Sequence, residues 1–419
     1  MLVEFRVRNF RSFRHEQSIS FVASKDTSHL DTNCIETGVK NVPQLTRSSV
    51  IYGANASGKS NLLFALATMR NMVAQSTSLP EPQFVEQYTP FRLDVASSHE
   101  PTGFEITVLL AGVRYQYGFE YDSQRIRGEW LVVYKTGKGQ RWFERSANIN
   151  AEEEWGSFSA YLTGPRETWR KATRPQALFL TTAVQLNSEQ LKPLFDWITN
   201  GMMILTWFGA ASMWPTLQRL DEPNFKSRVL ELLRAADIHV VDIRVDRQPG
   251  HQIELKLEPG KTPEMAARDL EVPIVKYLHK MEGGTTVEFD NRYESAGTQK
   301  LLAYIGPLLE AIDSGKLLVI DEIDSSLHPM VTRFILGLVH EPSISTHNAQ
   351  LWITTHDTSL LDTDLLRRDQ VWFVEKDETQ ASHLYPLSDF SPRKNEALER
   401  GYLRGRYGAL PFVSSPKLH

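Results

Sequence analysis

The stretch Ile51-Tyr52-Gly53-Ala54-Asn55-Ala56-Ser57-Gly58-Lys59-Ser60-Asn61 decides how this chain folds. It contains an apolar strand end, a loop of small residues and the start of a helix, and it fits the pattern G-x-x-x-x-G-K-[ST]. Small side chains let backbone N–H groups approach the oxygens of a triphosphate, and Gly53 and Gly58 give the loop its conformational freedom. The loop from Gly53 to Asn61 is therefore predicted to bind a nucleotide.

The residues that follow the loop complete this prediction. Lys59 is expected to reach the β- and γ-phosphates, and the Ser60 hydroxyl is expected to ligate Mg²⁺. A helix is predicted next, because apolar residues recur at spacings of three and four: Leu62, Leu63, Leu66, Met69 and Val73. A Gly/Ser turn could match the pattern by chance, but the flanking strand and helix argue against this. We predict a protein that binds ATP and Mg²⁺.

Composition excludes several classes of protein. The 419 residues include 51 acidic and 46 basic ones, so the overall charge does not indicate a nucleic-acid binder. The single cysteine, Cys34, excludes a disulfide framework and a cysteine-rich zinc site, and it suits a reducing interior. No signal peptide is visible, and the longest apolar stretch, Gly201 to Trp214, is shorter than the roughly 20 residues of a membrane span. We interpret that stretch as a buried helix or an interface, and we expect a soluble cytoplasmic protein with no membrane contact.

Apolar patterns elsewhere predict an α/β fold. Alternation predicts antiparallel strands near 2–7, 19–22, 103–110, 113–121 and 128–135, whereas the continuous apolar run 316–320 is typical of a buried parallel strand. A second strand is expected at 351–355 and a last hairpin at 370–387. Helical spacing appears at 188–198 and 226–236, with extended segments at 240–245 and 252–257.

We therefore expect a mixed parallel core sheet, an antiparallel N-terminal lobe and a mainly helical insertion. The predicted boundaries are 1–141 for the N-terminal lobe, 142–284 for the insertion, 285–390 for the C-terminal lobe and 391–419 for a basic tail. The tail contains Arg393, Lys394, Arg400, Arg404 and Arg406.

Acidic and imidazole side chains follow the two predicted parallel strands. Asp321 and Glu322 end the apolar run, so Asp321 is expected to hold Mg²⁺ and Glu322 to polarise the attacking water as a general base. His356 follows the strand 351–355, where a neutral imidazole could contact the γ-phosphate. An ordinary acidic strand end and an ordinary surface histidine are the alternatives. The pair Asp362 and Asp364 lies in a polar connector, and we assign it no metal role.

A second turn with small residues precedes a helix at Glu294-Ser295-Ala296-Gly297-Thr298-Gln299-Lys300. Such a turn at a helix start can bind an anion, although the pentapeptide alone is a weak signal. It lies about 25 residues before the paired carboxylates, and one chain has no second triphosphate to offer it. We therefore expect Ser295, Gly297 and Gln299 to cap a nucleotide held by Lys59 of another copy, in a homodimer or a higher homo-oligomer.

Together these segments resemble the motifs of ABC-type ATPases. The segments 53–60, 295–299, 317–322, Asp324 and His356 are similar to the Walker A, signature, Walker B, D-loop and H-loop motifs, respectively. The opening Asn9-Phe10-Arg11-Ser12-Phe13 resembles the branch that contains the SMC, Rad50 and RecF proteins, and the resemblance implies that Arg11 and Ser12 lie near the nucleotide. The glutamine of the family's Q-loop is not placed; Gln83 and Gln87 are the candidates.

More narrowly, the segments 52–60, 321–329 and 402–408 resemble the AAA15 ATPases of bacterial phage-defence systems, of the RloA/AbiL and PARIS types. This resemblance implies an ATPase that senses infection and controls a separately encoded effector, commonly a Toprim-type nuclease. Too few residues follow His356 to form such an effector domain. The alternative is a DNA-repair ATPase like RecF, with DNA as the partner of the N-terminal and tail arginines. Long heptads and a C-x-x-C apex are missing from the sequence, which argues against Rad50 or SMC proper.

Overall fold

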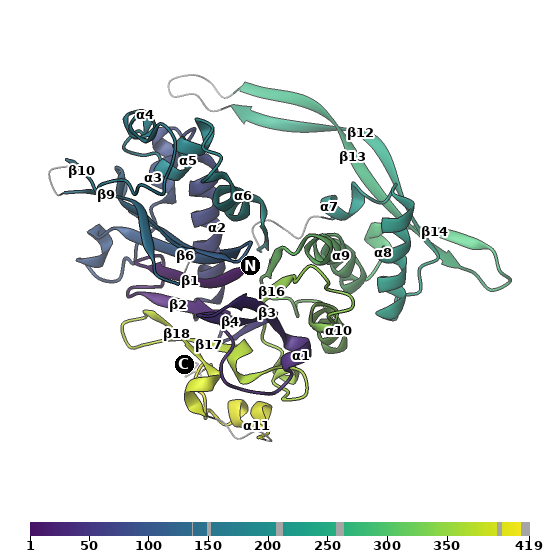
Figure 1. Ribbon diagram of the computed structural model, residues 1–419. Coiled ribbons are helices and arrows are strands. Elements are labelled where there is room, and N and C mark those ends of the chain that lie inside the picture. The colour runs from purple at the N-terminus through teal and green to yellow at the C-terminus, as the bar shows by residue number, and fades with distance from the viewer. Residues whose placement is uncertain (136, 149–151, 207–212, 257–263, 392–395, 412–419) are drawn as a thin grey trace, which may run out of the picture. The chain divides into compact units, whose positions relative to one another are not determined.

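The computed structural model describes residues 1–419 except 136, 149–151, 207–212, 257–263, 392–395 and 412–419 (Figure 1). The chain divides into two compact units. Unit 1 contains Met1–Phe208, Glu310–Ser325 and Thr332–His419, and unit 2 contains Gly209–Leu309 and Ser326–Val331.

The core of unit 1 is a six-stranded sheet that carries the phosphate loop. Its order is β11-β15-β16-β5-β17-β18, in which the first five strands are parallel and β18 is antiparallel to β17. The strands are β5 (Ser48–Tyr52), β11 (Met202–Leu205), β15 (Leu317–Ile320), β16 (Gln350–Thr354), β17 (Val371–Lys376) and β18 (Ser382–Pro386). Every residue of β5, β15 and β16 is buried, as expected for parallel strands covered on both faces.

The second sheet of unit 1 is antiparallel throughout and has the order β10-β9-β8-β7-β6-β1-β2. Its strands are β1 (Leu2–Arg8), β2 (Gln17–Ser20), β6 (Thr102–Leu110), β7 (Val113–Tyr121), β8 (Ile126–Tyr134), β9 (Gln140–Ala147) and β10 (Glu153–Trp155). A small hairpin, β3 (Cys34–Val39) and β4 (Val42–Thr46), leads into β5. The expected antiparallel N-terminal lobe is confirmed, and it extends to residue 155.

The helices of unit 1 are α1 (Leu30–Asn33), α2 (Lys59–Gln75), α3 (Glu81–Gln87), α4 (Arg166–Ala172), α5 (Phe179–Gln185), α6 (Lys192–Asn200), most of α10 (Pro329–His340) and α11 (Leu398–Leu403). The apolar stripe predicted for α2 is fully buried in one cluster with residues of β1 and β6. Packing of this stripe therefore fixes the helix that begins at Lys59.

Unit 2 consists of a three-stranded antiparallel sheet and helices. The sheet has the order β12-β13-β14, with β12 (Asp242–Lys256), β13 (Glu264–Lys280) and β14 (Thr286–Asp290), and the first two strands form the long hairpin in Figure 1. The helices are α7 (Trp214–Leu217), α8 (Pro223–Ala235) and α9 (Ala296–Ser314), whose last residues belong to unit 1.

Two sequence-based expectations about this region are wrong. The segment 142–284 is helical at α4 to α6 and at α8, but its second half is the hairpin β12–β13, so it is not mainly helical. Residues 202–205 are the edge strand β11 and not part of a buried helix, because they pair with β15. Residues 207–212 of the same apolar stretch lie outside the described residues, as do Arg393 and Lys394 of the basic tail. Over the part of the chain that the structure describes, no helix is both long and apolar enough to cross a membrane.

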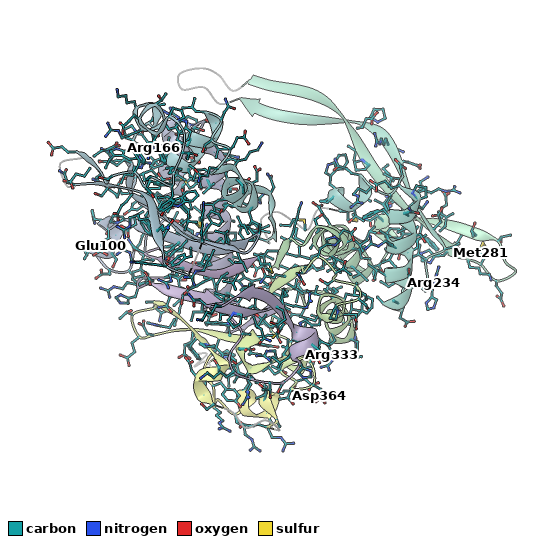
Figure 2. All side chains as sticks on the ribbon, in the orientation of Figure 1. Glu100, Arg166, Arg234, Met281, Arg333 and Asp364 are labelled. Carbon is teal, nitrogen blue, oxygen red and sulfur yellow. The ribbon has the colours of Figure 1, made fainter. Side chains whose placement is uncertain are left out.

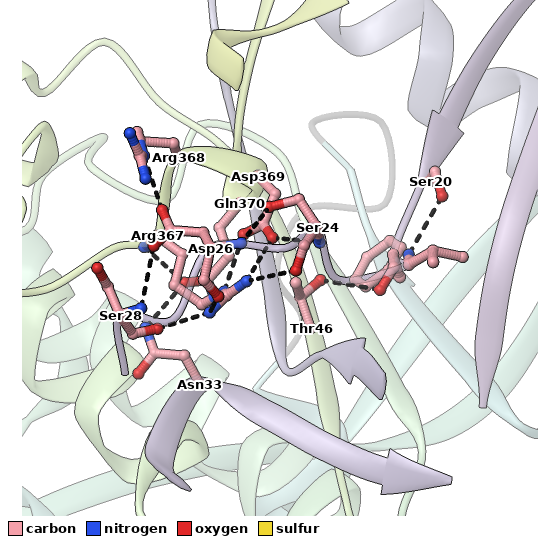
Figure 3. A network of polar contacts seen from close by, with 12 residues as sticks. Ser20, Ser24, Asp26, Ser28, Asn33, Thr46, Arg367, Arg368, Asp369 and Gln370 are labelled. Atoms are coloured by element: carbon pink, nitrogen blue, oxygen red, sulfur yellow. Dashed lines mark hydrogen bonds and ion pairs between the residues drawn. The ribbon is translucent and has the colours of Figure 1, made fainter. Parts of the chain in front are cut away.

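A buried polar network joins distant segments of unit 1 at the start of β5 (Figure 3). The Arg367 guanidinium is fully buried, pairs with Asp369 at 2.6 Å and donates to the carbonyl oxygens of Asp26 and Ser28. Gln370 donates to the Ser48 hydroxyl at 2.7 Å. Buried charges are tolerated when they are paired and hydrogen-bonded, so this network fixes the strand that leads to the phosphate loop.

Candidate nucleotide site

The phosphate loop lies between β5 and α2, in a conformation that its small residues allow. Gly58 has φ of +119°, a backbone conformation that L side chains rarely adopt. A Cβ on Gly53 would lie 2.4 Å from the Val374 carbonyl oxygen, so only glycine fits beside β17. Ala56 also has a positive φ, of 61°. The Ser57 hydroxyl oxygen is buried and has no hydrogen-bond partner, as expected for a loop built to surround a polar ligand.

The Lys59 side chain lies over this loop. Its ammonium donates to the carbonyl oxygens of Gly53 at 2.8 Å and Ala54 at 3.0 Å. Burial lowers the pKa of Lys59 to about 8, and the nearby carboxylates of Glu322, Asp321 and Asp324 counteract this by raising it. A buried ammonium held only by carbonyl oxygens is poised to exchange them for phosphate oxygens.

The acidic strand end is organised by Thr354, a residue that sequence reasoning missed. The Thr354 hydroxyl donates to Asp321 Oδ1 at 2.6 Å and accepts from the Glu322 N–H at 2.7 Å. Asp321 is buried, whereas the Glu322 side chain is 46% exposed. Glu322 has φ of +47°, a strained backbone conformation for this residue type, and such strain tends to occur at functional sites.

His356 lies beside the same carboxylates. Its Nε2 is 4.0 Å from Glu322 Oε1, and its backbone N–H donates to the Asp324 carboxylate at 3.2 Å. Burial lowers the pKa of His356, and the Lys59 ammonium lowers it further, against the opposing effect of Asp324, Glu322 and Asp321. The imidazole is therefore neutral at pH 7, which is the form predicted to contact the γ-phosphate.

The tip of the first hairpin contacts the phosphate loop. Asn61 Nδ2 donates to the Ser12 hydroxyl at 2.9 Å, and the Arg11 guanidinium lies 3.4 Å from Asn61 Oδ1 and 4.3 Å from the centre of the Phe64 ring. Ser382 at the start of β18 completes this contact, since its hydroxyl donates to the Ser57 carbonyl oxygen at 2.5 Å and its oxygen lies 2.8 Å from Ser12 Oγ, within hydrogen-bond distance of that hydroxyl. Arg11 and Ser12 are thus brought to the loop.

The phosphate loop and the Glu322 side chain line a pocket of about 370 Å³. Its lining contains the loop residues from Asn55 to Asn61, the Glu322 side chain and Lys376 at the end of β17. Lys376 was not predicted, although a strand end beside the phosphate loop in the sheet was a signal that could have found it. Thr354 could have been found as the polar residue level with Asp321 in the parallel sheet; for Ser382 the sequence offered no signal.

The donor set in this pocket fits Mg²⁺. Mg²⁺ prefers hard oxygen ligands and is bound in nucleotide sites through one or two carboxylates together with phosphates. Ser60 supplies a hydroxyl and Asp321 a carboxylate of this kind, both in unit 1 beside the pocket. Among the described residues no cluster of three or more His, Cys, Asp or Glu could hold a metal on its own. The Asp362 carboxylate in particular pairs with Arg333, which is labelled in Figure 2, at 2.8 Å.

The turn at Ser295 lies in unit 2 and is formed independently of the pocket. The Ser295 hydroxyl accepts from the Thr298 N–H at 3.0 Å and so caps the start of α9. The Gln299 amide donates to the carbonyl oxygens of Asn291 and Glu294 at 2.8 Å and 3.0 Å, so this side chain shapes the turn. A Cβ on Gly297 would lie 2.8 Å from the Ser326 carbonyl oxygen. Ser295 itself is exposed.

The fold and the order of these motifs are those of an ABC-type ATPase. The phosphate loop, the serine-glycine turn, the acidic strand end and the histidine occur in that order along the chain, and all but the turn lie at one edge of the parallel sheet. The chain belongs to the family described as "AAA domain, putative AbiEii toxin, Type IV TA system", which it matches over residues 48–177 and 211–362.

Solved structures similar to the chain include SMC head domains. One is the SMC head domain from Thermotoga maritima, with 14% identity, a TM-score of 0.41, and coverage of 92% of this chain and 98% of that chain. Another is the Smc head domain with an extended coiled coil bound to the C-terminal domain of ScpA, derived from Pyrococcus furiosus. It has 11% identity, a TM-score of 0.41, and coverage of 92% and 96%. Comparison with curated proteins gave no match.

Proposed function

We propose that the chain is a switch ATPase that hydrolyses ATP, closes on ATP with a second copy of itself, and thereby controls a separately encoded effector in bacterial defence against phage. The observation that carries the proposal is the pocket in unit 1, where the phosphate loop, the Glu322 carboxylate and Lys59 meet. The family description also supports it, because it names an abortive-infection toxin of a toxin–antitoxin system.

Within the pocket, each side chain has a distinct role in this proposal. Lys59 exchanges the carbonyl oxygens of Gly53 and Ala54 for β- and γ-phosphate oxygens, and the loop N–H groups bind the remaining ones. Ser60 and Asp321 hold Mg²⁺. When bound, Mg²⁺ neutralises the phosphate charge that develops during transfer.

Hydrolysis is assigned to the strand ends. Glu322 accepts a proton from the water that attacks the γ-phosphate, and its 46% exposure leaves the carboxylate accessible to that water. His356 contacts the γ-phosphate as a neutral imidazole, 4.0 Å from the base. Thr354 fixes the spacing between Asp321 and Glu322 by bonding to both residues.

The turn at Ser295 in unit 2 is the part of one copy that binds the nucleotide of the other copy in this proposal. Ser295 is exposed, and the start of α9 presents backbone N–H groups at a helix N-terminus, where anions are stabilised. We assign Ser295 and Gly297 to the γ-phosphate held by the partner copy, with Gln299 holding the turn in shape. The ATP-bound state is then a homodimer or a larger homo-oligomer.

The DNA-repair alternative has less support. The N-terminal arginines that could contact DNA phosphates form ion pairs: Arg6 with Glu4 at 3.0 Å, Arg8 with Glu120 at 2.8 Å and Arg14 with Asp94 at 3.1 Å. Stimulation of hydrolysis by DNA, with a steep dependence on salt, would favour this alternative.

The test of the proposed function is the pair Glu322→Gln and Lys59→Ala. We expect Glu322→Gln to bind ATP as the parent does, to lose at least about 100-fold in kcat and to accumulate as an ATP-bound dimer or larger assembly in size-exclusion chromatography with light scattering. Lys59→Ala should bind no ATP and remain in the assembly state of the nucleotide-free parent. Hydrolysis by Glu322→Gln at the parent rate would refute the assignment of the base. For the defence role, cells that express the chain with its neighbouring genes should resist phage, and Lys59→Ala should abolish this resistance.

A further inference from the structure

We infer that Lys376 is a second phosphate-binding lysine, which contacts the phosphate chain of the nucleotide from the end of β17. This inference rests on the proposed function and names a further substrate-binding residue of the same site.

Strand pairing puts Lys376 beside the phosphate loop. Strand β17 runs parallel to β5 with Phe373 opposite Tyr52, so the next residues of β17 run alongside the loop that starts at Gly53. The Val374 carbonyl oxygen confirms this neighbourhood, since a Cβ on Gly53 would lie 2.4 Å from it. Two residues further on, the strand ends with Lys376, which lines the 370 Å³ pocket together with Asn55 to Asn61.

The two carboxylates next to Lys376 in sequence are engaged elsewhere. Glu375 accepts from the Ala409 N–H at 2.8 Å. Asp377 accepts from the Thr379 N–H at 2.8 Å, from the Ala381 N–H at 3.0 Å and from the His383 ring, also at 2.8 Å. His383 and Thr379 thereby hold the pKa of Asp377 well below its usual range, so this carboxylate stays charged and stays within the turn. Lys376 itself is exposed and lines the pocket.

The backbone under Lys376 is fixed to the loop. Ser382 lies opposite Lys376 in the β17–β18 pairing. Its hydroxyl donates to the Ser57 carbonyl oxygen, and its backbone N–H donates to the Ser12 carbonyl oxygen at 2.7 Å. A lysine side chain is flexible, but a stem anchored this close to the loop keeps its ammonium within reach of the same phosphates.

Negative charge in the pocket makes a second cation favourable. The nucleotide brings several negative charges to a site that already contains Glu322 and the buried Asp321. Lys59 is the cation of the loop itself, and its ammonium donates to the carbonyl oxygens of Gly53 and Ala54. An ammonium on β17 offsets the remaining repulsion at the mouth of the pocket.

The test is the affinity for Mg·ATP, measured by isothermal titration calorimetry for Lys376→Met, Lys376→Arg and the control Lys192→Met. Lys192 is exposed at the start of α6 and does not line the pocket. A charge-assisted hydrogen bond predicts that Kd rises about 10- to 100-fold in Lys376→Met. Lys376→Arg should regain most of the affinity because it keeps the charge, and Lys192→Met should match the parent. The loss in Lys376→Met should shrink in about 1 M salt, where exposed charges are screened.

A Kd for Lys376→Met within twofold of the parent would overturn the inference, and so would a loss that Lys376→Arg does not repair. Lys59→Ala separates this failure from failure of the proposed function. If Lys59→Ala no longer binds ATP while Lys376→Met binds it with the parent affinity, the assignment of the nucleotide site is retained and only the role of Lys376 is refuted. If Lys59→Ala also binds ATP normally, the site itself is wrongly assigned and the inference falls with it.

Discussion

Replacing Thr354 by valine tests whether one hydroxyl positions the catalytic carboxylates. Valine has nearly the shape of threonine, so Thr354→Val removes the bond to Asp321 at 2.6 Å and the bond from the Glu322 N–H at 2.7 Å and leaves the buried packing of β16 intact. A hydrogen bond to a charged group contributes about 1.5–3 kcal/mol and a neutral one about 0.5–1.5 kcal/mol. Together they predict a loss of roughly 2–4 kcal/mol in the free energy of unfolding.

The kinetic effect should be larger on turnover than on binding. The loop and Lys59 are untouched, so Kd for ATP should stay within about threefold of the parent value. A displaced base costs on the order of 100-fold in rate when its position shifts by about 1 Å, so kcat should fall between about 10- and 100-fold. Thr354→Ser keeps the hydroxyl and is the matched control. Steady-state ATPase assays with urea unfolding measure both effects, and a Thr354→Val enzyme with the parent kcat would refute the positioning role.

Three further predictions concern Gly58, Lys59 and the buried ion pair of Arg145. Gly58→Ala should abolish ATP binding, because φ of Gly58 is +119° and the new Cβ would lie 2.3 Å from Ser382 Oγ. The control is Gly112→Ala, because Gly112 has φ of +76° and open space around it. Equal Kd values for ATP in the two variants would contradict the prediction. The Kd for ATP should rise about fivefold from pH 8 to pH 9, because free Lys59, with its pKa of about 8, loses its proton over this range. The stability of the nucleotide-free protein should instead rise between pH 8 and 10.5, where the unfolded chain holds more protons. A flat Kd profile over this pH range would exclude a binding role for this ammonium. Arg145→Met should lower the free energy of unfolding by about 3–5 kcal/mol, because it leaves the fully buried Glu129 carboxylate without the ion pair that it forms with Arg145 at 2.9 Å. Thermal unfolding measures this change, and a loss below about 1 kcal/mol would contradict the prediction.

Local chemistry explains what the sequence could predict. The phosphate loop is recognisable because its function depends on small residues at fixed spacing, and β15 is recognisable because a parallel strand buried on both faces must be apolar throughout. The stripe on α2 was predictable for the same reason, since its period matches the helix. The roles of Glu322 and His356 remain predictions, although the structure brings the two side chains together.

Features that depend on pairing between distant segments could not be predicted. The sequence predicted separate extended segments at 240–245 and 252–257, yet β12 continues from Asp242 to Lys256 through Pro249, because it is an edge strand and such strands tolerate proline. Ser24, Asp26 and Ser28 lie in an irregular segment, and their hydrogen-bond partners Arg367 and Asp369 come more than 300 positions later in the chain. Ser382 acquires its position only through the pairing of β18 with β17.

The strand order of the core sheet also constrains when the pocket can form during synthesis. Strand β5 leaves the ribosome early, but its neighbours β16 and β17 are residues 350–354 and 371–376. A nascent chain therefore carries its phosphate loop without either neighbouring strand until residues 350–376 have been translated, and such distant pairings form slowly. A product that terminates before β16 carries the loop sequence without the two strands that flank β5 in the sheet.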